Sequence, residues 1–508
     1  MSEIERKEEE TIEAKTFSGL ILHTKVKVIF NTLLYVVLGP VLLYGILHAI
    51  LHWQSHCISS ETKTVTIEKE APIFWIYANN TETGYLRHVL LVLERLGFQR
   101  GSRESSWDLL WAHDYPFTTI SNDLTNLKRH QKVNHFPGCG YITNKVLLST
   151  TEGKHLPAAF KIPDDADTFL KYVAHNPNKS FVQKSNSHRG IKIYETSELN
   201  LAAKDTFIQE FIERPYLVDG YKFDIGVYTV ITSVDPLRVY TYKGDVLFRF
   251  CPVKYYPFDP ENVDKYVVGD DYLPIWKVPS LQNYYSKLGF SMKDSFDAYV
   301  KSRGEDPWKV WHNIHEAIRD ITLKKEAQIK QVVNRYGNGR NFFELVRFDF
   351  SLDENLNVFT MEANMSPNLS SAHFPPNQLL YEQVLFNLFA LVGIGQRVKK
   401  NSLSIRTVKE QEMEVADKNI VIAPELCALC EDCFRLECQL CKPCFTDEMK
   451  LILTQSYLEN QNKMDYYRIF PPSVTEINNM SLTNYTLKNQ LLMRWYQRKC
   501  ESDFTWCT

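Results

Sequence analysis

The sequence lacks a surplus of charge of either sign, and it lacks internal repeats. Its 508 residues include 58 Lys and Arg against 61 Asp and Glu, a formal net charge of -3. No overall basic field favours a nucleic acid partner, so we expect none. The absence of a unit repeating every 20–50 residues or so excludes solenoids and propellers. With 44% hydrophobic residues, the composition is globular.

One segment lacks charged side chains altogether. Residues 28–51 contain no Asp, Glu, Lys or Arg, and a run of this length crosses about 30 Å of hydrocarbon. We therefore predict a single transmembrane helix between a polar tail, residues 1–27, and a stalk, residues 52–70. Lys25 and Lys27 before the helix weakly favour a lumenal or extracellular large domain, and the cytosolic face stays open as the alternative.

The remainder of the chain divides into three parts by composition. Residues 71–398 alternate strand-like and helix-like patterns with turn signals, which predicts an α+β domain. Residues 399–422 are polar and charged, as in a linker. Residues 423–508 form a Cys-rich C-terminal region.

Two blocks of the large domain place polar residues beside strand-like runs. Phe181–Ile193 reads FVQKSNSHRGIKI, in which a polar loop and Lys184 suit a phosphate group. From Tyr221 onward, period two puts Lys222, Asp224 and Gly226 on one strand face. Buried polar groups need a partner or a ligand. The alternatives are a surface hairpin for the first block and an ordinary ion pair for the second.

A third block predicts a carboxylate-bearing hairpin. Residues 341–371 contain two apolar, strand-like runs around the polar turn DENLN. Centring the hairpin on that turn places Asp349 opposite Glu362 and Arg347 opposite Asn364, within about 5 Å on one face. Such close like charges repel unless a cation joins them, and oxygen ligands suit Mg²⁺ or Mn²⁺. A solvated acidic hairpin is the alternative.

Together the blocks resemble a known family in order and spacing. The matching motifs are DLLWAHDYPF, VNHFPG, QKSNSHRGI, IQEFI, DGYKFDI, FELVRFD and MEANMSPNL. In combination they resemble the tubulin tyrosine ligase-like family over roughly residues 71–395. The resemblance implies an ATP-grasp fold with an N-terminal lobe. It also implies ATP with Mg²⁺, or Mn²⁺, as cofactors.

The resemblance also assigns expected roles to residues that match the family motifs. Lys145 and Lys184 would contact nucleotide phosphate, and Lys222 the nucleotide. The inter-lobe segment that holds adenine through its backbone comprises Gln209, Glu210, Phe211 and Ile212. Asp224 would lie near nucleotide or acceptor, and Arg249 would act with it in catalysis. The metal ligands would be Asp349, Glu362 and Asn364.

Gly226 departs from the family pattern, which places arginine after K-F-D-(I/L). A cation is therefore missing from that strand face, and losing one such group costs about 10²–10³ in rate. Arg249 either substitutes for the missing cation or is the family's own second arginine. We favour the second interpretation. We expect it on the returning strand of a hairpin that turns at residues 243–245. The phosphate loop is also a residue shorter than usual, with Lys192 at its second glycine.

The implied reaction is ATP-dependent ligation of an amino acid, most simply glutamate, to a protein carboxylate through an acyl phosphate. Tubulin or the microtubule is the expected acceptor. One alternative is a membrane-tethered scaffold that binds nucleotide or tubulin without catalysis. The other is a ligase for a lumenal substrate.

The C-terminal region carries six closely spaced cysteines. Cys427, Cys430, Cys433, Cys438, Cys441 and Cys444 read C-x2-C-x2-C-x4-C-x2-C-x2-C. Paired C-x2-C spacing suits Zn²⁺, whereas an oxidising compartment would give three disulfides with about 15 conceivable pairings. Both interpretations stay open, and both give the segment a structural role.

Overall fold

A computed structural model describes residues 43–52, 71–186, 192–194, 196–337, 339–394, 415–422 and 424–508. The chain divides into two compact units, Met1–Lys69 and Glu70–Thr508. Each unit is described by itself.

The predicted membrane anchor is corrected by the first unit. Its described part is an exposed helix over residues 43–52. Among the described residues, no helix is long and apolar enough to span a bilayer. The single transmembrane helix and the membrane localisation drawn from it are therefore not supported. Residues 28–42 of the predicted span lie outside the described residues.

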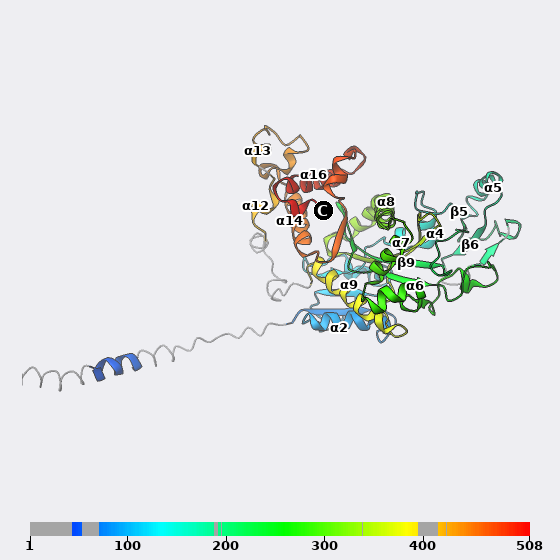
Figure 1. Ribbon diagram of the computed structural model, residues 1–508. Helices are drawn as coiled ribbons and strands as arrows, with labels where there is room; N and C mark the ends of the chain where they lie inside the picture. Colours follow the sequence, from blue (N-terminus) through cyan, green and yellow to red (C-terminus); the bar gives the residue numbers. More distant parts are fainter. Residues whose placement is uncertain are drawn as a thin grey trace, which may run out of the picture. The chain divides into compact units, whose positions relative to one another are not determined.

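The second unit begins with a parallel sheet in the order β2-β1-β3-β4. Its strands are β1 (Ile73–Tyr77), β2 (Gln99–Arg100), β3 (Leu109–Ala112) and β4 (Lys132–Val133). Helix α2 (Arg87–Arg95) follows β1 and contacts α9 (Gln378–Leu391), and the two are seen together in Figure 1. Buried His88 on α2 bonds Glu382 on α9 at 3.1 Å. The N-terminal sheet is thereby tied to the end of the large domain.

A second sheet has its own small core. It runs β5-β8-β6-β7 and is antiparallel. Its strands are β5 (Ala159–Ile162), β6 (Phe181–Ser185), β7 (Lys192–Tyr194) and β8 (Thr206–Glu210), with α5 (Ala166–His175) beside them. Phe160, Phe169 and Phe181 pack edge to face in this core. The core is separate from the main one, so β6 and β8 present Lys184 and Gln209 from a lobe of their own.

The central sheet is built around β9 (Phe223–Val234), a strand of 12 residues. One edge of β9 pairs with β13 (Glu344–Leu352), which pairs in turn with β14 (Val358–Asn364). The other edge pairs with β11 (Leu247–Phe250) near its start and β10 (Leu237–Tyr242) near its end. Short β12 (Leu273–Pro274) and β15 (Tyr466–Phe470) complete the sheet.

This arrangement corrects the hairpin predicted at residues 243–245. Strands β10 and β11 do not pair with each other. Both lie along the same edge of β9, because that strand is long enough to accommodate two short partners end to end. The consequence for the site is that Arg249 on β11 stands directly opposite Asp224 on β9.

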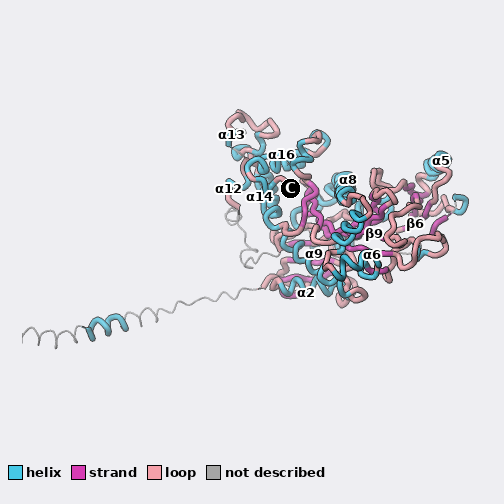
Figure 2. The backbone as a smooth tube through the Cα atoms, viewed as in Figure 1, coloured by secondary structure: helices cyan, strands magenta, loops and turns pink. Residues whose placement is uncertain are grey.

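The remaining helices lie beside these sheets or within the C-terminal region. Figure 2 draws helices as cyan coils and strands in magenta. They are α3 (Gly140–Thr143), α4 (Lys145–Ser149), α6 (Pro279–Gln282), α7 (Met292–Ser302), α8 (Trp308–Val333), α12 (Asp417–Ile420), α13 (Pro424–Cys427), α14 (Asp447–Asn462), α15 (Val474–Asn478) and α16 (Leu487–Ser502). The 26-residue α8 contacts β9, β10, β14 and β15, and its buried face includes Ile314, Ile318 and Ile321.

The C-terminal region combines a disulfide-linked segment with helices that dock on the sheet. Cysteine pairs join Cys427 to Cys441, Cys430 to Cys438, and Cys433 to Cys444. Because a metal needs free thiolates, these pairs leave no ligand set for Zn²⁺, and the zinc alternative is not supported. A further disulfide joins Cys500 and Cys507.

Two contacts anchor this region to the central sheet. Strand β15 pairs with β10, and buried Arg238 on β10 forms an ion pair at 2.8 Å with Glu459 on α14. Thr232 and Tyr240 also donate to Glu459. A small separate core around Trp495 holds α14, α16 and the segment from Val415 together.

Candidate functional site

The β13–β14 hairpin pairs the residues as the sequence predicts. Asp349 lies opposite Glu362, and Arg347 lies opposite Asn364. Nearer the turn the register shifts by one, because Phe350 pairs with Thr360, which leaves Met361 as the extra residue of a bulge. Bulges commonly re-aim side chains beside functional sites. Here the bulge sets Glu362 opposite Asp349 and allows their side chains to share a face.

Asp349 is the most heavily bonded member of the hairpin. Its side chain is 2% exposed. Arg347 donates from Nε to Oδ1 at 2.6 Å and from Nη2 to Oδ2 at 2.8 Å. Arg249 Nη2 and Asn364 Nδ2 also donate to Oδ2, at 2.9 and 3.1 Å. Because each carboxylate oxygen has about two lone pairs, Oδ1 is the atom that keeps room for a cation.

Glu362 is the carboxylate that faces open space. Its side chain is 29% exposed, and Oε2 lies 3.3 Å from Lys145 Nζ. Asn364 Nδ2 donates to Oε1 at 3.1 Å. Burial alone would raise the pKa of Glu362, but the charges of Lys145 and Arg347 and the Asn364 hydrogen bond outweigh it and lower the pKa to about 2. Glu362 is thus an anion across the physiological range.

Asp224 and Arg249 form a bidentate pair between β9 and β11. Arg249 donates from Nε and Nη2 to the two Asp224 oxygens at 2.9 and 2.7 Å. Burial, followed by the nearby charge of Asp349, raises the pKa of Asp224 in spite of Arg249. The two carboxylates raise the pKa of Arg249 against the effect of its burial. One arginine therefore bridges Asp224 and Asp349.

Three lysines lie together beside these carboxylates. Lys184 on β6 donates to Gln209 Oε1 at 3.0 Å, Lys222 donates to the Tyr266 carbonyl at 2.8 Å, and Lys145 begins α4. Burial, together with the charges of Lys222 and Lys145, lowers the pKa of Lys184 to about 8 in spite of the opposing charge of Glu362. Mutually repelling cations of this kind favour binding of a polyanion.

Part of the inter-lobe segment, residues 209–212, already has hydrogen-bond partners within the protein. The Glu210 side chain points to α5, where it accepts from Tyr172 at 2.7 Å and pairs with Lys179. The backbone N–H groups of Glu210 and Phe211 already donate to the Ala158 and Ser180 carbonyls. Any adenine contact from the backbone N–H groups of this segment therefore falls to Ile212.

These residues fit a nucleotide and a divalent ion. Gln209 is 1% exposed, and its Nε2 has no hydrogen-bond partner among the described residues. A buried, unpartnered donor beside three lysines suits the polar atoms of a nucleotide. Glu362 and Asn364 offer oxygen ligands to Mg²⁺ or Mn²⁺, and Asp349 Oδ1 has room for a further bond.

One part of the predicted nucleotide site cannot be placed. Residues 187–191 of the phosphate loop lie outside the described residues, as does the side chain of Lys192. The loop begins at Asn186, whose Oδ1 accepts from the Lys145 backbone N–H at 3.0 Å. The start of the loop is therefore joined to α4.

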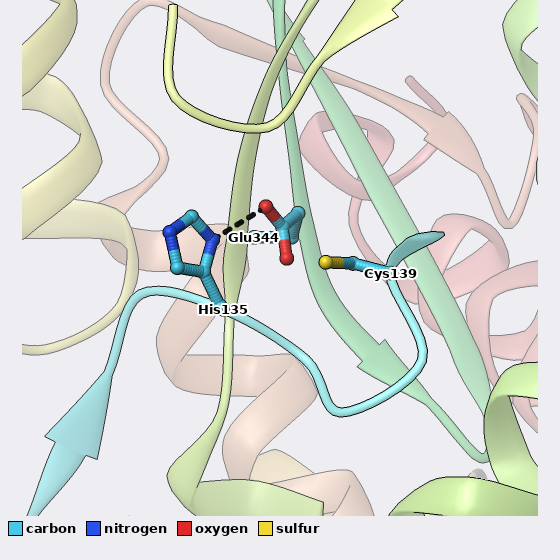
Figure 3. Close-up of side chains that lie close together, drawn as sticks. All are labelled: His135, Cys139 and Glu344. Carbon is cyan, nitrogen blue, oxygen red and sulfur yellow. Dashed lines mark hydrogen bonds and ion pairs between the residues drawn. The ribbon is translucent and has the colours of Figure 1, made fainter. Parts of the chain in front are cut away.

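A buried cluster anchors the start of β13. Figure 3 shows His135, Cys139 and Glu344, whose ligand-type atoms lie within 4.8 Å of one another. His135 Nδ1 donates directly to Glu344 at 2.8 Å, and the Phe136 N–H donates to its other oxygen at 2.9 Å. Zinc ligands stand farther apart, because each lies about 2.0–2.3 Å from the ion. Burial raises the pKa of Cys139 well above its usual value, so it stays a thiol. We interpret the cluster as a hydrogen-bonded clamp.

Arg347 was not predicted to be a site residue. Strand parity alone puts Arg347 and Asp349 on one face, since Asp349 is two positions after Arg347. The role of the Gln209 side chain was also missed, because the family expectation concerned the backbone there. The signal available for Gln209 was a polar residue within the apolar run of β8.

Comparisons with known proteins show which family the chain belongs to. Residues 123–401 match the model of the tubulin-tyrosine ligase family. The chain is 41% identical over 441 residues to a probable tubulin polyglutamylase, ttll-15 of Caenorhabditis elegans, covering 84% of this chain and 85% of that protein. The chain therefore belongs to the tubulin-tyrosine ligase family, and it is a ligase.

More distant relatives are longer proteins. The chain is 26% identical over 331 residues to the mouse tubulin polyglutamylase TTLL6, covering 61% of this chain and 39% of that protein. It is 27% identical over 319 residues to the human tubulin monoglutamylase TTLL4, covering 59% of this chain and 26% of that protein. The chain thus spans less than half the length of these two relatives.

Proposed function

We propose that this ligase uses ATP and Mg²⁺ to join glutamate to a protein carboxylate, with the glutamate-rich tail of tubulin as acceptor. The observation that carries the proposal is the juxtaposition of Lys145, Lys184 and Lys222 with the partly exposed carboxylate of Glu362. The names of the relatives, which are tubulin polyglutamylases and a monoglutamylase, support the amino acid and the acceptor.

The chemistry requires activation of the acceptor, because a carboxylate is a poor electrophile. An acceptor oxygen attacks the γ-phosphorus of ATP and ADP leaves. The glutamate amine then attacks the acyl carbon, the C–O bond to phosphate breaks, and the amine releases a proton. The lysines neutralise charge that develops on the transferred group. Glu362, Asn364 and Asp349 would hold the divalent ion, which when bound supplies further neutralisation.

The test uses the full chain with tubulin, ATP, Mg²⁺ and labelled glutamate. We expect label in tubulin only when ATP is present. Glu362→Gln should lower the rate of incorporation by about 10²–10³, and Glu354→Gln should leave it unchanged, because Glu354 pairs with Arg214 at the exposed turn of the same hairpin. Hydroxylamine in place of glutamate should trap the activated acceptor as a hydroxamate.

A scaffold that binds without catalysis predicts a different result. If the chain is such a scaffold, it would bind nucleotide or tubulin but give neither labelled tubulin nor hydroxamate. That combination contradicts the ligase proposal.

A further inference from the structure

The absence of a side chain at Gly226 is explained by the neighbouring side chain of Arg347 and not by the backbone conformation. It lies within β9, opposite Leu247 on β11 and Asp349 on β13, and its φ is not among the positive ones. Any residue could adopt that backbone conformation. A Cβ there, however, would lie 2.9 Å from Arg347 Cδ and 3.2 Å from Asp349 Oδ1. The missing side chain therefore leaves the space that Arg347 occupies.

Arg347 reaches this space from the next strand. Its backbone stands opposite Tyr228 on β9, so the side chain runs diagonally along the sheet to pass over Gly226. Both of its hydrogen bonds to Asp349 come from one edge of the planar guanidinium group, through Nε and Nη2. The side chain is 6% exposed. The charge of Asp349 raises the pKa of Arg347 in spite of burial.

Arg347 is the dedicated partner of Asp349. Arg249 divides its bonds between Asp224 and Asp349, and Asn364 divides its own between Asp349 and Glu362. Among the described residues that bond Asp349, only Arg347 donates two hydrogen bonds to it, from Nε and Nη2. A buried carboxylate without such a partner is strongly disfavoured as an anion.

Resting on the proposed function, we infer that Arg347 is a positioning residue that holds Asp349 for the divalent ion. It supplies from β13 the cation that the family pattern places on β9 at position 226. Gly226 and Arg347 thus act as a coupled pair. An arginine added at Gly226 alone has no room beside Arg347, so we expect it to weaken the site.

The first test measures metal dependence. Full-length Arg347→Met should need about 10–100-fold more Mg²⁺ or Mn²⁺ for half-maximal binding of a fluorescent ATP analogue, the range for groups that orient metal ligands. At saturating metal its affinity for the analogue should stay within about threefold. Arg214→Met, at the exposed ion pair of the hairpin turn, is the matched control and should not shift. An unshifted metal requirement in Arg347→Met overturns the inference.

A second variant covers failure of Arg347→Met to fold. Arg347→Lys keeps the charge and removes the fork, which is not a conservative change at a bidentate site. It should fold with wild-type melting behaviour and still shift the metal requirement by several-fold. Equal metal dependence of folded Arg347→Lys and wild type contradicts a positioning role.

The reciprocal exchange tests the coupling. Gly226→Arg and Arg347→Gly should each raise the metal requirement at least tenfold. The double variant Gly226→Arg/Arg347→Gly should recover at least tenfold over the worse single variant, because one arginine again fills one space. Gly269→Ala, where a Cβ meets nothing within 4 Å, is the glycine control. Strictly additive losses overturn the coupling.

The readout separates this inference from the proposed function. Metal-dependent nucleotide binding can be measured whether or not glutamate is transferred. If wild-type protein transfers no glutamate but the Arg347 variants shift the metal requirement, only the proposed function fails. If transfer occurs and the shift is absent, only the present inference fails.

Discussion

The β13–β14 hairpin and the C-terminal region are held together in different ways. The hairpin gathers Asp224, Asp349 and Glu362 with three cations, Lys145, Arg249 and Arg347, in a shared network of ion pairs. The C-terminal region relies on four disulfides and a small apolar core. We expect the charge in the hairpin to serve a ligand and the cross-links of the C-terminal region to serve stability. Substitutions in the two regions should therefore separate activity from stability.

The largest expected effect is on stability at the junction of the two regions. Glu459→Met removes the partner of buried Arg238 and should lower the free energy of unfolding by about 3–5 kcal/mol. The measurement is denaturant unfolding of the full chain. Glu448→Met is the control, because the pair of Glu448 with Lys488 is largely exposed and such pairs contribute about 1 kcal/mol or less. Equal losses would contradict the assigned role of Glu459.

The next effect is on activity in the hairpin. Glu362→Gln should lower the rate of glutamate transfer by about 10²–10³, because it removes the carboxylate that faces the lysines. The melting temperature should change by less than that of Glu459→Met, since Glu362 is partly exposed. Parallel rate and melting measurements on both variants make the comparison direct. Loss of folding in Glu362→Gln would show that the charge is structural.

A smaller effect on stability is expected at the last disulfide. Replacing Cys500 and Cys507 by serine opens a short loop of sequence separation 7 and should cost about 2–3 kcal/mol by the chain-entropy relation. Transfer activity at low temperature should stay unchanged. A loss of activity without a loss of stability would place this loop in the function of the hairpin.

The smallest effect is a pH dependence carried by Lys184. Its pKa of about 8 in the folded protein lies below the usual value, so the lysine loses its charge as pH rises through 8. Affinity for a nucleotide should then fall by up to about tenfold per pH unit above 8 and stay level below it. Lys184→Arg remains charged and should remove this fall. A level profile in the wild-type protein would contradict contact between Lys184 and phosphate.

The local sequence pattern predicted the hairpin, whereas side-chain contacts that depend on long-range packing could not be predicted from it. Alternation and a polar turn were enough to pair Asp349 with Glu362. The bulge at Met361 could not be predicted, because alternation alone does not locate an extra residue on a strand. The approach of Arg347 to Gly226 could not be predicted either, because it requires two strands distant in sequence to be aligned.

The C-terminal region was the least predictable part. Spacing revealed six clustered cysteines but not their pairing, which the folded backbone selects. Arg238 and Glu459 are 221 positions apart, and neither stands out in its own segment. The membrane span was predicted from an uncharged run alone, and among the described residues no helix of sufficient length supports it.

The central claim is that the β13–β14 hairpin holds a divalent ion beside the phosphates that the lysines bind. A crystal structure with Mn²⁺ and a non-hydrolysable ATP analogue tests it most directly through the anomalous signal of the metal. We predict a manganese peak within about 2.5 Å of oxygen atoms of Glu362 and Asn364, next to the terminal phosphate. A peak on the phosphates with neither residue as ligand would contradict the account.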